Sequence, residues 1–277
     1  MLKSFAGGRL FGGGWGSGVP TVLALHGWQR THGDFAPVFG DSGSGTGVGI
    51  GFGPGVSAIA PDLFGFGATP APPEAWGSDE YAHHLLPLFD EPAVLGDRVV
   101  VVGHSFGGRV AVRLQRMVPD RIERMVLCGV PLLGRDGPPA RTAPAYRMVR
   151  RLHRMGLIGD RRMEAAKNRY GSADYRAAQG VIRDVLVRLL AEDYTDDMAS
   201  IGCPVDLVWG EEDIEVPLEV AERAQRMMAE ARLHVLPGVG HLVPTEAPRE
   251  LLRVILGPAV EGPSPGAVDG GPMAGTS

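Results

Sequence analysis

The stretch RVVVVGHSFGGRVAVRLQRMVPD, residues 98–120, decides the fold class of this chain. Its first part, residues 98–105, is a continuous β-branched run that ends in Gly-His-Ser, which is typical of a strand buried on both faces. Its second part carries apolar residues at helical spacing from Val110 to Met117. A buried strand that turns directly into an amphipathic helix is the repeating unit of an α/β protein.

Outward from this unit, similar runs and helical stretches alternate along the chain. Five more short apolar runs predict strands at 21–27, 56–62, 124–131, 204–210 and 231–238. Two further stretches, 217–230 and 245–256, predict helices with a proline near the start. Because the strand runs are continuous rather than alternating, they favour an α/β fold with a doubly wound, mostly parallel sheet.

The alternation of predicted strands and helices is interrupted between the strands 124–131 and 204–210. Residues 132–198 show helical segments and little strand character, which predicts a helical lid inserted between strands. We therefore expect a core made of 1–131 and 199–258, with the lid above the carboxyl ends of the strands. The Gly- and Pro-rich tail 259–277 is predicted to be disordered, because so few large apolar groups cannot repay the entropy of ordering.

Composition excludes several classes of protein. The 277 residues are 44% hydrophobic and 21% charged, so the chain is long and apolar enough to bury a core. A net charge of −5 lacks the basic footprint of a nucleic-acid binder. The two cysteines, Cys128 and Cys203, stand far apart and predict neither a disulfide framework nor a zinc site.

The distribution of apolar residues along the sequence bears on the localisation of the protein. Glycines interrupt any apolar signal core within 1–20, and no apolar run approaches the roughly 18 residues that span a bilayer. We expect a cytoplasmic protein without a membrane partner. The glycine-rich stretch 40–55 has neither a GxGxxG nor a GK[ST] register, so it predicts a solvent-facing loop rather than a phosphate site.

Ser105 is the first candidate for chemistry. Gly103-His-Ser-Phe-Gly107 is a G-x-S-x-G pattern in the context that this motif requires, after a strand and before a helix. The glycines allow close packing while the serine hydroxyl projects at the carboxyl edge of the sheet. The helix that begins there favours developing negative charge. The pattern predicts a nucleophilic serine rather than a helix cap.

A serine nucleophile needs a base and an acid that orients it. Of the eight histidines, His241 follows the last predicted strand and precedes the last helix, where such folds hold functional groups. Three acids follow the strand 204–210, and Asp213 is preferred over Glu211 and Glu212, which stand closer to the strand. The chain order Ser, Asp, His fits this fold.

An oxyanion would need two backbone N–H donors. One is predicted at Phe106, the residue after the candidate nucleophile. The other is predicted at Trp28, in the loop that follows the His26-Gly27 end of a strand. His32, in the same loop, is expected to be a bystander.

These segments together resemble the α/β-hydrolase superfamily, in its cap-bearing esterase, C–C hydrolase and epoxide-hydrolase-like branch. The segments that carry the resemblance are HGW (26–28), PDLFGFGATP (61–70), GHSFGG (103–108), WGEEDIEVP (209–217) and PGVGHLVPTEAP (237–248). The resemblance implies Ser105 as nucleophile, Asp213 as acid and His241 as base, with Trp28 and Phe106 as oxyanion donors. It implies no cofactor and no metal. A serine where dehalogenases and epoxide hydrolases place an aspartate disfavours those two activities.

The expected function is hydrolysis of a carboxylic ester, or a related acyl bond, of a small-molecule substrate through an acyl-enzyme. The same three residues would also serve a C–C bond hydrolase or a cofactor-free haloperoxidase. A non-catalytic ligand-binding protein of the same fold is a third alternative.

The residues of the predicted lid indicate which class of substrate the site would accept. Four apolar residues of its first half and three of its second half are predicted to face the pocket: Leu152, Met155, Leu157, Ile158, Val185, Leu186 and Leu189. Six arginines, at 147, 150, 151, 154, 161 and 162, either form a solvated outer face or point inward to hold a substrate carboxylate. The outer face is the preferred interpretation. If all six are exposed, a neutral substrate is favoured.

Overall fold

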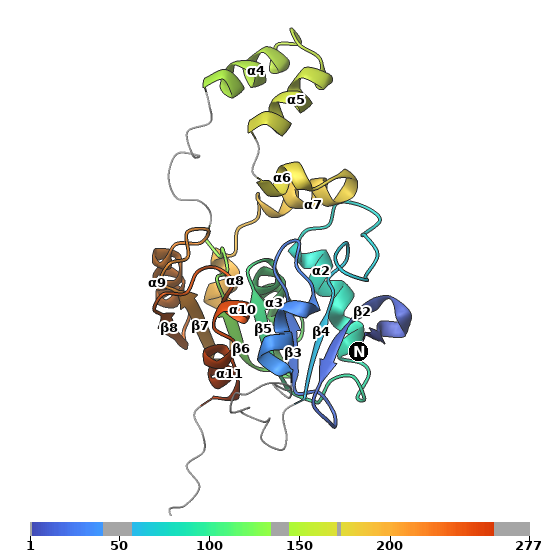
Figure 1. The fold of residues 1–277 in the computed structure, drawn as a ribbon, viewed down its shortest axis with the longest axis vertical. Coiled ribbons are helices and arrows are strands. Elements are labelled where there is room, and N and C mark those ends of the chain that lie inside the picture. Colours follow the sequence, from blue (N-terminus) through green and yellow to red (C-terminus); the bar gives the residue numbers. More distant parts are fainter. Residues whose placement is uncertain (1, 41–56, 134–143, 171–172, 258–277) are drawn as a thin grey trace, which may run out of the picture.

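The computed structural model describes residues 2–40, 57–133, 144–170 and 173–257. Its centre is an eight-stranded sheet (Figure 1) with the order β1-β2-β4-β3-β5-β6-β7-β8. The strands are β1 (Lys3–Phe5), β2 (Leu10–Trp15), β3 (Val22–Leu25), β4 (Ala58–Pro61), β5 (Val99–His104), β6 (Ile122–Cys128), β7 (Val205–Gly210) and β8 (Ala231–Leu236). The six strands from β3 to β8 pair in parallel, and β1 and β2 join antiparallel at one edge.

The six parallel strands confirm the predicted mostly parallel sheet. They form where the apolar runs predict them. From β3 to β7 the strands are mostly buried, as strands covered on both faces are, while β8 at the edge of the sheet is partly exposed. In β3, Val22 and Ala24 belong to one apolar cluster and Leu23 and Leu25 to the other, as the alternation of side chains along a strand requires.

Helices pack on both faces of the sheet. The described helices are α1 (Ala36–Phe39), α2 (Ser78–Leu85), α3 (Phe106–Met117), α4 (Pro144–Arg154), α5 (Asp160–Tyr170), α6 (Ala173–Ala177), α7 (Gly180–Leu189), α8 (Thr195–Ser200), α9 (Leu218–Met227), α10 (Val243–Glu246) and α11 (Pro248–Leu256). Buried residues of α2, α3 and α9 contribute to one apolar cluster, and those of α1, α10 and α11 to the other. This arrangement confirms the doubly wound architecture.

Strands β1 and β2 were not expected, because glycines fill this part of the sequence. β2 reads LFGGGW, yet it pairs along its length with β4, from Gly12 opposite Pro61 to Trp15 opposite Ala58. A Cβ on Gly12 would lie 2.1 Å from the carbonyl oxygen of Ala60. The glycine therefore allows a close backbone approach that a side chain would prevent.

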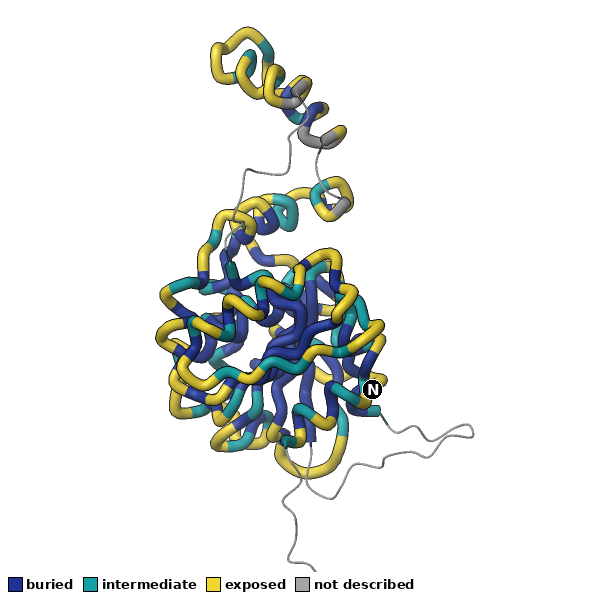
Figure 2. Tube along the Cα trace, turned by 90° about the vertical axis from the view of Figure 1, so that its left-hand side faces the viewer, coloured by how far each residue is buried: buried dark blue, intermediate teal, exposed yellow. Residues whose placement is uncertain are grey.

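Helices α4 to α8 lie between β6 and β7 in the chain, so the inserted segment is helical as expected. In both views, α4 and α5 stand away from the rest of the molecule (Figures 1 and 2), and their surface is largely exposed. Met155 and Leu157 are 60% and 63% exposed, so the prediction that they face a pocket is wrong. Leu152 and Ile158 are half-buried. Met163 and Ala166 of α5 are buried, and α5 packs against α4.

The second half of the inserted segment packs more closely. Val185, Leu186 and Leu189 of α7 are buried, and that they face a pocket stays a prediction. All six arginines of the first half are exposed, which agrees with the solvated outer face. The predictions for the glycine-rich loop and for the C-terminal tail fall largely on 41–56 and 258–277, outside the described residues.

Candidate active site

Ser105 occupies the turn between β5 and α3. Its backbone has φ 49° and ψ −113°, a left-handed conformation that non-glycine residues rarely adopt. The Ser105 amide donates to the carbonyl oxygen of Cys128 at 2.9 Å, which ties the turn to the end of β6. A Cβ on Gly107 would lie 2.2 Å from the carbonyl oxygen of Leu25, so the helix can approach β3 only with glycine there. The strain at Ser105 is thus held by close packing on both sides.

Asp213 and His241 form a buried pair at the ends of β7 and β8. Nδ1 of His241 donates to Oδ2 of Asp213 at 2.8 Å, and the two side chains are 9% and 0% exposed. Oδ1 of Asp213 accepts from the amides of Glu215 and Val216, at 2.9 and 2.8 Å. The carboxylate is therefore fixed by three hydrogen bonds. Glu211 and Glu212 are exposed and make no contact with the imidazole among the described residues.

The charge on this pair affects how readily His241 takes a proton. Burial lowers the pKa of His241, but the hydrogen bond and charge of Asp213, with smaller effects of Glu215 and Glu246, outweigh burial, and the pKa lies above its usual value. Nε2 of His241 lies 3.7 Å from Oε2 of Glu215. Within the described part of the chain, no hydrogen bond joins the imidazole to Ser105.

His104 links the two halves of this site. Its Nε2 donates to the carbonyl oxygen of His241 at 3.0 Å, and the two rings lie 5.0 Å apart. Burial, together with the neighbouring His241, lowers the pKa of His104 to about 4. Its Nδ1 is buried and has no hydrogen-bond partner among the described residues. His104 is therefore a neutral residue that holds the backbone of His241 next to Ser105.

Gly129 lies close to both His241 and Asp213. It follows β6 with φ 55°, and a Cβ there would lie 3.0 Å from Nδ1 of His241 and 3.2 Å from Oδ2 of Asp213. Sequence reasoning missed this residue, because its role depends on a neighbour more than a hundred positions away. The Gly-Val-Pro that follows the strand 122–128 was the available signal.

Trp28 and Phe106 lie against each other beside Ser105. Their rings make an edge contact with centroids 5.7 Å apart, and both pack against Phe66. Nε1 of Trp28 is buried without a hydrogen-bond partner among the described residues. The structure therefore brings together the two residues that the sequence predicts as oxyanion donors.

The loop that carries Trp28 is held by a polar cluster that the sequence did not reveal. Nδ1 of His26 donates to the carbonyl oxygen of Gly27 at 2.8 Å, and its Nε2 accepts from the Leu63 amide at 2.9 Å. Oδ1 of the buried Asp62 accepts from both the amide and Nδ1 of His32, at 2.7 and 2.8 Å. His32 is thus no bystander, because it joins the loop after β3 to the loop after β4.

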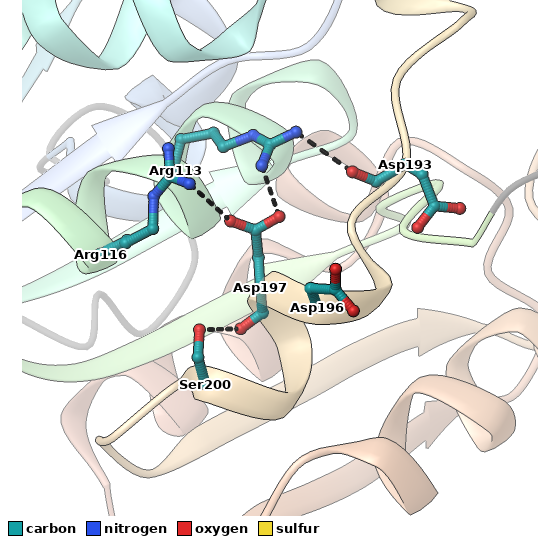
Figure 3. Close-up of a pocket in the computed structure, with 6 residues that line it drawn as sticks. All are labelled: Arg113, Arg116, Asp193, Asp196, Asp197 and Ser200. Carbon is teal, nitrogen blue, oxygen red and sulfur yellow. Dashed lines mark hydrogen bonds and ion pairs between the residues drawn. The ribbon is translucent and has the colours of Figure 1, made fainter.

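A hollow of about 430 Å³ lies between α3 and α8 (Figure 3). It is lined by Arg113, Arg116, Asp193, Asp196, Asp197 and Ser200. Arg113 and Arg116 both form ion pairs with Asp197, and Arg113 donates to the carbonyl oxygen of Asp193 at 3.1 Å. Both arginines of this hollow are thus engaged with Asp197, so neither guanidinium faces it as a free cation that would hold an anionic substrate.

Two other features concern the described residues, a metal centre and a membrane-spanning helix. No group of three or more His, Cys, Asp or Glu residues that could hold a metal ion occurs among them. No helix in the described ranges is both long and apolar enough to cross a membrane.

The chain is similar in sequence to proteins of known family. The sequence model of the Alpha/beta hydrolase family matches residues 22–254. A 2-hydroxy-6-oxo-2,4-heptadienoate hydrolase of Pseudomonas putida is 29% identical over 71% of this chain and 76% of its own. A non-heme haloperoxidase of Rhodococcus erythropolis is 30% identical over 85% of this chain and 90% of its own.

Solved structures share the fold. A thermophilic esterase from Thermogutta terrifontis superposes with a TM-score of 0.63 at 22% identity, covering 92% of this chain and 97% of its own. A meta-cleavage product hydrolase from Pseudomonas fluorescens superposes with a TM-score of 0.61 at 21% identity, covering 92% and 96%.

Proposed function

This chain belongs to the alpha/beta hydrolase family, and from that premise we propose that it is a serine hydrolase that cleaves carboxylic esters through an acyl-enzyme. The observation that carries the proposal is the strained turn at Ser105 together with His241, whose Nδ1 is held by a buried carboxylate and whose carbonyl oxygen accepts from His104, the residue before Ser105. Strained backbone of this kind clusters at active sites. The hydrogen bond from Nδ1 leaves Nε2 as the nitrogen that can take a proton.

In the proposed mechanism, Ser105 attacks the ester carbonyl while Nε2 of His241 takes its proton. Asp213 keeps the imidazole in the right tautomer and stabilises the imidazolium. The amides of Trp28 and Phe106 donate to the oxyanion of the tetrahedral intermediate. His241 then gives the proton to the leaving alcohol. Water attacks the acyl-enzyme by the reverse sequence and restores Ser105.

The inserted segment 132–198 is proposed to be a lid over this site. Support comes from α7, where the carbonyl oxygen of Leu189 accepts from Arg109 of α3 at 3.0 Å. Arg109 stands one helical turn after Ser105, so α7 lies near the nucleophile. The outward position of the six arginines of α4 and α5 favours a neutral substrate, since a free guanidinium facing the site would be needed to hold a carboxylate.

The experiment is an assay of 4-nitrophenyl butyrate hydrolysis by the wild type, Ser105→Ala and His241→Gln. We expect each substitution to lower kcat by about 10³-fold or more. Ser200→Ala, on the exposed face of α8, is the matched control and keeps the wild-type rate. A fluorophosphonate probe labels the wild type and not Ser105→Ala. Equal rates for the wild type and Ser105→Ala contradict the proposal.

The relatives favour two further candidates on the same residues, a C–C bond hydrolase and a haloperoxidase. A 2-hydroxy-6-oxo-dienoate distinguishes the first from an esterase, because its loss of visible absorbance reports cleavage directly. Monochlorodimedone halogenation reports the second. A ligand-binding protein of this fold would be stabilised by its ligand without turnover, equally in the wild type and in Ser105→Ala.

A further inference from the structure

Glu215 places a carboxylate beside the nitrogen of His241 that faces the reaction. Nδ1 of His241 is engaged by Asp213, and Oε2 of Glu215 lies 3.7 Å from the other ring nitrogen, Nε2. Within the described ranges, the ion contact of Glu215 is this one with His241, and no arginine or lysine neutralises the carboxylate there. A net negative charge therefore lies beside the atom that exchanges protons with the substrate.

The backbone of Glu215 is fixed even though its side chain faces solvent. The Glu215 amide donates to Oδ1 of Asp213 at 2.9 Å. The carbonyl oxygen of Val216 accepts from the buried Nε1 of Trp209 at 2.8 Å. The side chain of Glu215 is 66% exposed, and that of the preceding Ile214 is 93% exposed. The carboxylate thus reaches from a fixed backbone to Nε2 of the imidazole while it stays open to solvent.

The chemistry at Nε2 determines which part of the substrate meets this charge. In ester cleavage the imidazolium gives its proton to the leaving alcohol, so the leaving oxygen must come within about 3 Å of Nε2. The alcohol part of the substrate then extends past Oε2 of Glu215. The acyl part lies instead toward the oxyanion donors.

We propose that Glu215 selects the leaving group, favouring esters of cationic or neutral alcohols over esters of anionic alcohols; this rests on the proposed ester hydrolysis at Ser105. Unit charges about 6 Å apart, at an effective dielectric constant of about 40 to 80 for an exposed side chain, change a rate by roughly three- to tenfold. The expected selectivity is of that order.

The test uses three acetate esters of similar size. Acetylcholine carries a cationic alcohol, 3,3-dimethylbutyl acetate is its neutral isostere, and 2-sulfoethyl acetate carries an anionic alcohol. Release of acetate gives kcat/KM for each ester in the wild type, Glu215→Gln, Glu215→Lys and Glu212→Gln. Glu212 is an exposed glutamate three residues before Glu215, so its neutralisation changes the net charge equally without removing the carboxylate at Nε2.

For Glu215→Gln, the ratio of kcat/KM for the cationic to the neutral ester should fall three- to tenfold, and the ratio of the anionic to the neutral ester should rise as much. Glu215→Lys should invert the preference, and Glu212→Gln should keep the wild-type ratios. Ratios in Glu215→Gln within about 1.5-fold of the wild type overturn the inference while leaving ester hydrolysis intact. A wild type that hydrolyses none of the three, or hydrolyses them equally after Ser105→Ala, contradicts the proposed function itself.

A pH profile gives a second readout that a purely structural role would not move. The charged or titratable groups that face His241 are Asp213, Glu215, Glu246 and His104. Loss of the Glu215 charge should shift the acidic limb of kcat/KM to lower pH, because the base then loses its proton more readily. The limb in Glu212→Gln should stay where it is in the wild type.

Discussion

Nε2 of His104 donates a hydrogen bond of 3.0 Å to the carbonyl oxygen of His241, so the residue before the candidate nucleophile holds the backbone of the candidate base. His104→Leu removes this donor and leaves a carbonyl group without its partner. We expect the free energy of unfolding to fall by about 1–3 kcal/mol, the cost of an unsatisfied buried polar group. Urea denaturation at pH 7.5 measures it. An unchanged midpoint and slope would show that water replaces the imidazole at no cost.

The pH dependence of stability follows from the same residue. The pKa of His104 is lowered from 6.5 to about 4 by burial, so the unfolded state binds the proton more tightly than the folded state. The stability that the neutral imidazole contributes is therefore fully present above pH 6.5 and is lost as the pH falls toward 4. Between pH 7 and pH 4.5, the wild type should lose about 2 kcal/mol more than His104→Leu. Parallel curves for the two proteins would contradict this assignment.

Gly129 tests whether the fit around His241 matters for the reaction. Gly129→Ala places a Cβ 3.0 Å from Nδ1 of His241, in a backbone with φ 55°. Gly238→Ala is the matched control, because Gly238 has φ 69° and open space around it. Both variants should lose about 1–2 kcal/mol of stability to the left-handed backbone. Only Gly129→Ala should also lower kcat for 4-nitrophenyl butyrate, by about tenfold or more.

Arg113 anchors the helix α8 to the helix α3. Its guanidinium pairs with Asp197, whose side chain is 7% exposed, and Arg113→Met leaves that carboxylate without its main partner. Thermal or urea unfolding should show a loss on the order of 3 kcal/mol. Arg253→Met, which breaks an exposed pair with Glu250, should cost at most about 0.5 kcal/mol. Similar losses in both variants would contradict the difference in burial.

The exposed arginines of α4 and α5 should be dispensable for a neutral substrate. We expect the double charge reversal Arg150→Glu and Arg154→Glu to keep kcat/KM for 4-nitrophenyl butyrate within about twofold of the wild type, because solvent screens charges on an outer face. A fall of tenfold or more would mean that these side chains reach the substrate.

The core of the fold could be predicted because its signals are local. Each parallel strand is a continuous apolar run, and each facing helix has its apolar residues at helical spacing, so pattern alone places them. β2 was not predicted because glycine has a low strand propensity. The close approach of β2 to β4 explains why its sequence, LFGGGW, contains glycines. For Met155 and Leu157 the prediction of a pocket-facing position was wrong, because an apolar residue in the sequence does not reveal whether another element covers its side chain.

The candidate site likewise contains residues that the sequence predicts and contacts that it does not. Ser105, Asp213 and His241 could be named as candidates because each follows a strand in the expected chain order, and the strand-to-helix turn favours the serine. Their positioning contacts were not found. His104, Gly129 and Glu215 act on His241 only once the sheet has brought distant strand ends together, and no spacing in the sequence records that distance.

The two edges of the sheet have a consequence for how the molecule behaves at high concentration. An open edge offers unpaired N–H and C=O groups to any second strand, and the sheets of different molecules can join there. Here one edge is β1, three residues long with the exposed Lys3, and the other is β8, which carries the exposed Arg232. A short strand and charged margins both oppose joining between sheets. Both edges of the sheet therefore carry features that oppose edge-to-edge aggregation.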